Sequence, residues 1–282
     1  TTTSKDAMHT LSFTGEHQLR YPAPDVARGA MLALIALANV PFWIAYFPEA
    51  PQAGHDAIAA LNQADQWWYL ARTVLVDRRA YPLFSILFGF GMAIMVSRTM
   101  ERERRAIEQN FPAEVVAGWP PVQRQIAKEN IERHVRRAAA RLIRRRGWWM
   151  LVFGAVHALF FSGDIIGAYG LVAVFFAEVI VMKRAWTRVL VGSLVAALSL
   201  FGLWGVGCGM GGTPMVLEYH GPLALTMFYP LMSLGNWLGA TIGTVLMSLV
   251  VPCVMIGVGV ARWGVLQDPR GHRLVLACVA VG

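Results

Sequence analysis

Six long apolar runs, separated by shorter polar segments, dominate the chain. They cover residues 26–47, 80–97, 148–163, 165–182, 189–207 and 236–261. Each run approaches the length of about 20 residues that a helix needs to cross a hydrocarbon core of about 30 Å. Several of them lack the polar face that a surface helix of a soluble protein carries. The pattern therefore predicts an all-α fold, a polytopic transmembrane helical bundle with at least six spans.

The boundaries near the C-terminal end are less regular. A further apolar stretch, residues 223–235, precedes the sixth run and contains Pro230 and Gly235. Because proline and glycine interrupt membrane helices, we expect an interfacial or re-entrant lead-in there. The chain stops at Gly282 inside another apolar run that is too short to cross a bilayer. We expect residues 1–282 to form one transmembrane domain that continues beyond this point.

Positive charge is concentrated in residues 98–147, which hold thirteen Lys and Arg residues against six Glu. Short basic loops stay on the cytoplasmic side of a membrane, so 98–147 is predicted to be a cytoplasmic loop. Counting spans outward from it places the N-terminus in the cytoplasm and residues 48–79 in an external loop. The prediction is a multi-pass protein of a cytoplasmic membrane.

The composition agrees with this assignment. Only 15% of the residues are charged, whereas soluble domains carry about a quarter. The formal net charge is +8, but most of it lies in one loop, so we expect membrane lipids and no nucleic acid as partners. Cys208, Cys253 and Cys278 are too widely spaced for a disulfide framework or a metal site, so no metal is predicted.

His157 and Asp164 are the first candidates for chemistry, because ionisable groups inside spans commonly mark functional sites. His157 follows Trp148 by nine residues, which is about 14 Å along a helix and close to the bilayer midplane. An imidazole there can exchange a proton, act as a nucleophile, or only join two helices. Asp164 lies seven residues further on, about 10 Å away if the helix continued. It can cap the next helix or orient His157.

Asp25, Arg28 and Asn39 form a second candidate group at the start of the first span. At about 100° per residue they share one stripe that descends from the cytoplasmic surface to the midplane. Each residue alone has a structural explanation as a cap, a snorkelling cation or an interhelical contact. Together they can line a path for an anionic ligand, with Arg28 pairing a phosphate or a carboxylate.

Glycines at four-residue spacing suggest a close helix contact. Gly235, Gly239 and Gly243 let a neighbouring helix approach, either within this chain or in a homodimer, and intramolecular packing is the more common outcome. The weaker candidates for a functional role are Glu178, Glu218, His220 and Asn236. Glu178 has a simple explanation in a pair with Lys183.

Several short motifs carry a family resemblance when they are taken together. They are DVARG from Asp25 with Asn39, LFSILFGFG from Leu83, GAVH ending at His157, GDIIGAYG from Gly163, and GVGVARWG from Gly257. In order and spacing they resemble the YeiB-like family of bacterial inner-membrane proteins, over about residues 20–282. That family is similar to transmembrane acyltransferases such as heparan-alpha-glucosaminide N-acetyltransferase.

The resemblance implies a reaction and a set of roles. An acyl group, acetyl in the simplest case, would pass from cytoplasmic acyl-CoA to a cell-envelope sugar or lipid, in a bacterial inner membrane and a bundle of about ten spans. Asp25, Arg28 and Asn39 would help to bind the CoA cosubstrate, and His157 would act as a general base or a transient acyl carrier. Asp164, with Tyr169, would orient His157 or the acceptor hydroxyl.

Two alternatives remain open from the sequence. Polar residues at the midplane also mark transport pathways, which would make the protein a small-molecule or lipid transporter or flippase. A non-catalytic membrane scaffold is the other alternative, with the basic segment 98–147 binding anionic lipid or an acidic partner.

Overall fold

The computed structural model describes residues 26, 29–30, 32–37, 62–72, 74, 80–110, 116–161, 163–209 and 228–264. This part of the chain is helical and contains no strand, which confirms the all-α prediction for it. Of the first predicted span, only residues 26, 29–30 and 32–37 are described, and they are helical. Most of residues 48–79, the weaker candidates Glu218 and His220, and everything after Gly264 lie outside the described residues.

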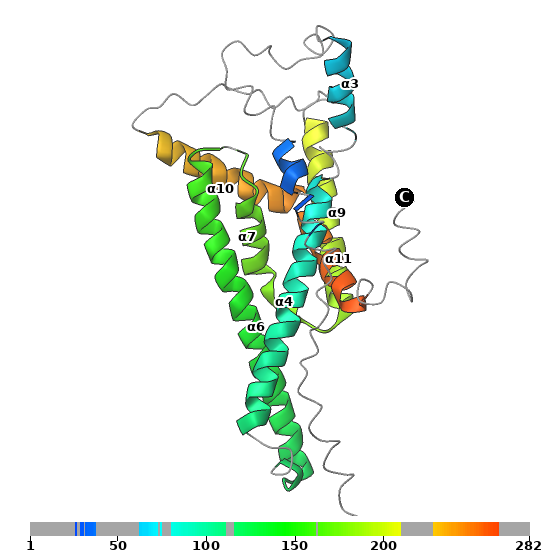
Figure 1. Ribbon diagram of the computed structural model, residues 1–282, viewed down its shortest axis with the longest axis vertical. Helices are drawn as coiled ribbons and strands as arrows, with labels where there is room; N and C mark the ends of the chain where they lie inside the picture. Colours follow the sequence, from blue (N-terminus) through cyan, green and yellow to red (C-terminus); the bar gives the residue numbers. More distant parts are fainter. Residues whose placement is uncertain are drawn as a thin grey trace, which may run out of the picture.

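The structure describes eight helices in detail, in this order along the chain. They are α3 (Gln63–Arg72), α4 (Ala80–Asn110), α6 (Pro121–Ala158), α7 (Ile166–Phe175), α8 (Ala177–Val181), α9 (Ala185–Gly209), α10 (Tyr229–Met247) and α11 (Val250–Trp263). α4 and α6 run side by side along the long axis, and α10 crosses the ends of α6 and α7 (Figure 1). The closest neighbours are α4 with α11 and α6 with α7.

Two of the described helices are long and apolar enough to cross a membrane. They are Tyr81–Asn110 in α4 and Ala185–Gly205 in α9. The bent pair α10 and α11 adds a third if its two halves act as one span. These helices are consistent with a membrane protein by length and composition. The count of at least six spans stays a prediction.

The basic segment 98–147 is not an irregular loop, because α4 and α6 continue through most of it. With 31 and 38 residues, these helices are about 46 Å and 57 Å long, well beyond a hydrocarbon core of about 30 Å. Their far halves project from the other helices as a helical hairpin (Figure 1). A 2.7 Å ion pair between Arg104 and Glu132 joins its two arms. We call residues 98–147 the basic hairpin.

The ion pairs next to the basic hairpin differ from those expected. Glu178 pairs with Arg144 of α6 at 2.9 Å, so its predicted pairing with Lys183 is wrong. Lys183 instead lies 2.8 Å from Glu132. Both pairs join α6 to the segment around α8. These residues are far apart along the chain, so the sequence did not indicate the two contacts.

Two glycines bring α4 and α11 into backbone contact. A Cβ atom added at Gly89 would lie 2.1 Å from the carbonyl oxygen of Val254, and one at Gly257 would lie 2.0 Å from that of Ile86. No side chain fits at either position. The LFSILFGFG and GVGVARWG motifs therefore have a packing role here, and Val254 is fully buried in the core beside them.

The predicted span 236–261 is broken rather than continuous. α10 and α11 meet at 60°, with Ser248 extended between them at φ −127° and ψ 169°. The cause is Pro252, which has no N–H to donate to Ser248 and whose ring would clash with that carbonyl in a continuous helix. Ser199 of α9 donates to the freed carbonyls of Leu246 and Ser248 at 2.8 and 3.1 Å. This hydroxyl, shared between the two carbonyls, thus gives the break a donor from the protein, as a lipid environment requires.

The interruption predicted at Pro230 and Gly235 is wrong for the same helix. α10 begins at Tyr229, with Pro230 in its first turn, where a missing N–H costs nothing, and it continues through Gly235. A Cβ atom at Gly235, Gly239 or Gly243 would meet no described atom within 4 Å. The close contact expected at these glycines therefore has no partner among the described residues.

Candidate active site at the turn between α6 and α7

The candidate site forms where the chain reverses after α6. This helix ends at Ala158, one residue after His157, and the N–H groups of Phe160 and Phe161 both donate to the His157 carbonyl oxygen, at 3.0 and 2.9 Å. α7 then starts at Ile166. The reversal brings Asp164 back alongside the last turn of α6.

His157 and Asp164 are in direct contact. Nδ1 of His157 lies 2.8 Å from Oδ1 of Asp164, much closer than the separation of about 10 Å for a continuous helix. The Asp164 side chain is completely buried, while 44% of the His157 side chain is exposed. The structure thus joins the two predicted catalytic residues, with the carboxylate inside and the imidazole at the surface.

Three further donors converge on the Asp164 carboxylate. Trp237 Nε1 and the Gly167 N–H donate to Oδ2 at 2.8 and 2.9 Å, and the Ile166 N–H donates to Oδ1 at 3.3 Å. The two backbone donors belong to the first turn of α7, whose dipole also favours a negative charge. Asp164 therefore caps α7 and orients His157 at the same time. Toward all three of these partners the carboxylate acts as an acceptor.

The tautomer of His157 follows from this network. Because the carboxylate accepts, Nδ1 of the imidazole is the donor, and in the neutral ring the lone pair lies on Nε2. No described residue hydrogen-bonds to Nε2. Phe161 packs beside the ring, with centroids 5.4 Å apart. A histidine held in this way can serve as a general base or as a nucleophile.

Two glycines make room for the buried carboxylate. A Cβ atom at Gly154 of α6 would lie 2.8 Å from both Asp164 Oδ2 and the Gly167 nitrogen. One at Gly167 of α7 would lie 2.8 Å from the Trp237 ring and 2.9 Å from Thr241 Oγ1. Three helices can approach Asp164 this closely only because both positions lack a side chain.

α10 closes the site with a stripe of donors at four-residue spacing. Tyr229 donates to the carbonyl oxygen of Leu159 at 2.9 Å, Ser233 to that of Ala158 at 2.6 Å, and Trp237 to Asp164. The first two satisfy carbonyls at the C-terminal end of α6. Sequence reasoning missed Trp237. The polar side chains at every fourth position of an apolar helix were the available signal.

Tyr169 is placed away from the dyad of His157 and Asp164. It is 1% exposed, and its hydroxyl lies 3.0 Å from Ser85 Oγ of α4. Its ring packs on Phe84 and Phe88, with centroids 5.2 and 4.9 Å away. In this position it joins α7 to α4, and its predicted contact with the acceptor stays a prediction.

The residues predicted to bind the CoA cosubstrate come from the start of the first predicted span. Asp25, Arg28 and Asn39 lie outside the described residues. Among the residues that are described, no group of three or more His, Cys, Asp or Glu side chains is arranged to hold a metal ion.

The comparisons with known proteins add no relative. The chain matches no protein-family model, no curated protein and no solved structure.

Proposed function

We propose that this protein is a transmembrane acyltransferase that moves an acyl group, acetyl in the simplest case, from cytoplasmic acyl-CoA to a sugar or lipid of the cell envelope. The observation that carries the proposal is the buried Asp164 carboxylate bonded to Nδ1 of a half-exposed His157. The resemblance of the sequence to a family of bacterial inner-membrane proteins supports the choice of acyl transfer over other reactions of a histidine base.

The dyad can act in two ways. As a general base, Nε2 of His157 takes the proton of the acceptor hydroxyl or amine while that atom attacks the thioester carbon and the C–S bond breaks. As an acyl carrier, Nε2 itself attacks that carbon, and CoA leaves as the thiolate. The acceptor then displaces the imidazole and gives it its proton. In both routes the ring becomes positively charged, and Asp164 stabilises that charge.

In the proposed topology the protein crosses a bacterial membrane six or more times, and its N-terminus and basic hairpin lie in the cytoplasm. Exposed arginines in the membrane-proximal part of α6 support this orientation, as do the exposed Trp148 and Trp149 beside them. Asp25, Arg28 and Asn39 would then begin on the side where acyl-CoA is found.

A transfer assay with the full-length protein tests the proposal. Proteoliposomes that contain the protein and an envelope extract receive radiolabelled acetyl-CoA, and label is followed into the sugar and lipid fractions. We expect transfer by the wild type and by His134→Ala, a control on the exposed part of α6, and at least about 100-fold less by His157→Ala. Equal transfer by His157→Ala and wild type would rule out the proposed role.

A non-catalytic scaffold is the second candidate, and the basic hairpin favours it. Arg137, Arg141 and Arg145 are exposed at four-residue spacing on α6, a surface suited to anionic lipid or an acidic partner. In a strain that depends on the protein, exchange of these arginines for glutamine would separate the two functions. Loss of function with normal acyl transfer would favour the scaffold.

A further inference from the structure

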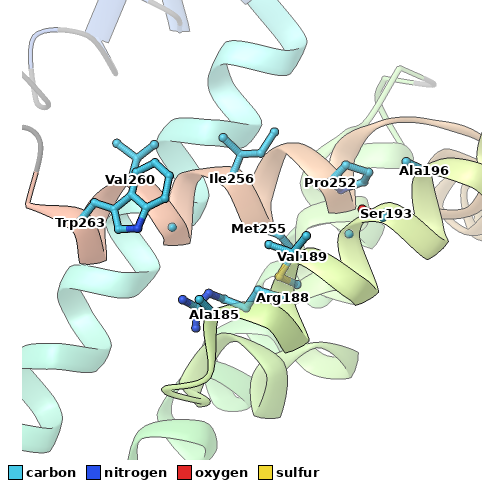
Figure 2. A pocket seen from close by; sticks show the side chains of 12 residues that line it. Ala185, Arg188, Val189, Ser193, Ala196, Pro252, Met255, Ile256, Val260 and Trp263 are labelled. Carbon is cyan, nitrogen blue, oxygen red and sulfur yellow. The ribbon is translucent and has the colours of Figure 1, made fainter. Parts of the chain in front are cut away.

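An open groove runs between α9 and α11, and neither dyad residue is among those that line it (Figure 2). Its volume is about 330 Å³, and its walls are largely apolar, with Val189, Gly192, Ile256 and Trp263 among the lining residues. Val189, Ile256 and Trp263 are 66%, 54% and 72% exposed. These side chains line a hollow between α9, which is long and apolar enough to span a membrane, and α11, one half of the bent pair that could form a third span.

The length of the groove matches one leaflet of a bilayer. Its lining extends from Ala185 to Ala196 on α9 and from Pro252 to Trp263 on α11. At 1.5 Å per residue, either stretch covers about 16 Å, roughly half of a hydrocarbon core of about 30 Å. In the proposed orientation the groove begins at the cytoplasmic interface and ends near the midplane, the depth that one acyl chain occupies.

The Arg188 guanidinium lines one end of the groove, and the Arg262 guanidinium shares a carbonyl partner with it. Arg188, which lines the groove and is 6% exposed, donates from Nη1 to the carbonyl oxygens of Met182 and Arg184 at 2.7 and 3.3 Å. Arg262 of α11 donates to Met182 and Ile180. Because both side chains bond the Met182 carbonyl, two positive charges lie close together at the C-terminal end of α8.

This positive charge has no anionic partner in the described part of the protein. Neither Arg188 nor Arg262 forms an ion pair with a described carboxylate. The nearby Glu178 is paired with Arg144, and Glu132 with Arg104 and Lys183. None of the described residues accepts a hydrogen bond from Nη2 or Nε of Arg188, so these donors remain for a ligand.

We infer that the groove binds one anionic phospholipid of the cytoplasmic leaflet, with an acyl chain between α9 and α11 and the phosphate at Arg188 and Arg262. A guanidinium can offer a phosphate two parallel hydrogen bonds. The carbonyl oxygens of Met182 and Arg184 already hold the Arg188 guanidinium in place. Trp263, next to Arg262, lies at the charged end of the groove, where aromatic side chains meet the headgroup region. This site requires that the chain spans a membrane but does not depend on acyl transfer.

Native mass spectrometry of the full-length protein tests this site. The detergent-solubilised protein is titrated with phosphatidylglycerol and, separately, with phosphatidylcholine of the same acyl chains. We expect one phosphatidylglycerol to be retained in preference to phosphatidylcholine. Arg188→Gln should weaken its retention about fivefold, since a basic side chain near a lipid phosphate contributes about that factor. Arg184→Gln, the exposed neighbour, should bind as the wild type does.

A second pair of variants tests the groove without touching its charges. A Cβ atom at Gly259, which lines the groove, meets no described atom within 4 Å, so Gly259→Leu has room for its first side-chain carbon and adds bulk to the groove. Gly205→Leu adds the same bulk to α9 outside the groove. We expect only Gly259→Leu to lose the retained lipid. Equal retention of the two lipids by the wild type, or full retention by Gly259→Leu, would overturn the inference. Gly259→Leu decides the matter if Arg188→Gln does not fold.

Discussion

Nδ1 of His157 lies 2.8 Å from Oδ1 of Asp164 across a reversal of the chain, so a buried carboxylate holds an imidazole that reaches the surface. The carboxylate also receives the indole N–H of Trp237 and two backbone N–H groups of α7. The carboxylate therefore links three helices and the proposed reaction centre, and changes at this point should affect stability, activity or both.

Asp164→Asn should damage both properties. The amide nitrogen of asparagine would face one of the existing donors, and the buried cluster would lose its charge, which we expect to cost about 3 kcal/mol of unfolding free energy. Acyl transfer should fall by at least about 100-fold, because His157 loses its charge partner. Thermal unfolding in detergent and the transfer assay measure the two effects. A variant as stable as the wild type would show that the carboxylate does not hold this junction together.

Trp237→Phe should weaken the junction without changing the imidazole. It removes one donor to the Asp164 carboxylate and keeps most of the ring, so we expect a loss of about 1.5–3 kcal/mol in unfolding free energy. Trp204→Phe on α9 is the control, because that side chain is 65% exposed and should change stability little. Similar unfolding temperatures for the two variants would contradict the importance of the indole hydrogen bond.

Gly154→Ala should push α6 and α7 apart. The added methyl group would lie 2.8 Å from Asp164 Oδ2 and from the Gly167 nitrogen, and we expect a cost of about 1–3 kcal/mol. Gly239→Ala on α10 meets no described atom within 4 Å, so better helix propensity should leave it neutral or slightly stabilising. A lower unfolding temperature for Gly154→Ala and an equal or higher one for Gly239→Ala would support the close packing at Gly154. Changes of the same sign in both variants would count against it.

Ser199→Ala should destabilise the break between α10 and α11. The Ser199 hydroxyl contacts the carbonyl oxygens of Leu246 and Ser248, and its loss would leave buried acceptors without this donor, at about 1–3 kcal/mol. Ser193→Ala, an exposed position on the same helix, is the control. Hydrogen exchange of residues 244–252 would show faster opening only in Ser199→Ala. Unchanged exchange there would mean that the break does not need this hydroxyl.

Acid should loosen the attachment of the basic hairpin at Glu132. The hydrogen bond from Lys183, helped by Arg104 and opposed by burial, holds the pKa of this carboxyl below its usual range. The folded state therefore gains stability from the ionised Glu132 at neutral pH and loses it as the pH falls through this lowered pKa. Glu132→Gln should cost about 1 kcal/mol at pH 7 and lose less on acidification than the wild type. A parallel pH dependence of unfolding in both proteins would refute this role.

The sequence by itself determined the helical class and the apolar segments, because both depend on local composition and on the absence of charge. For that reason the apolar parts of α4 and α9 could be recognised as long and apolar enough to cross a membrane. The pattern also pointed to His157 and Asp164, since ionisable residues are costly in an apolar run. The sequence pattern also located the basic charge in residues 98–147. It did not show that most of this segment is helical, because α4 and α6 continue beyond their apolar positions.

The tertiary structure alone decided which residues meet. α6 stops at Ala158, and this reversal converts a spacing of seven residues into a hydrogen bond. Trp237 is distant in the chain and reaches Asp164 only because Gly154 and Gly167 let three helices converge. Such contacts depend on the relative placement of helices. Local periodicity does not encode that placement, which explains why the dyad was a candidate from sequence while its buried partners were not.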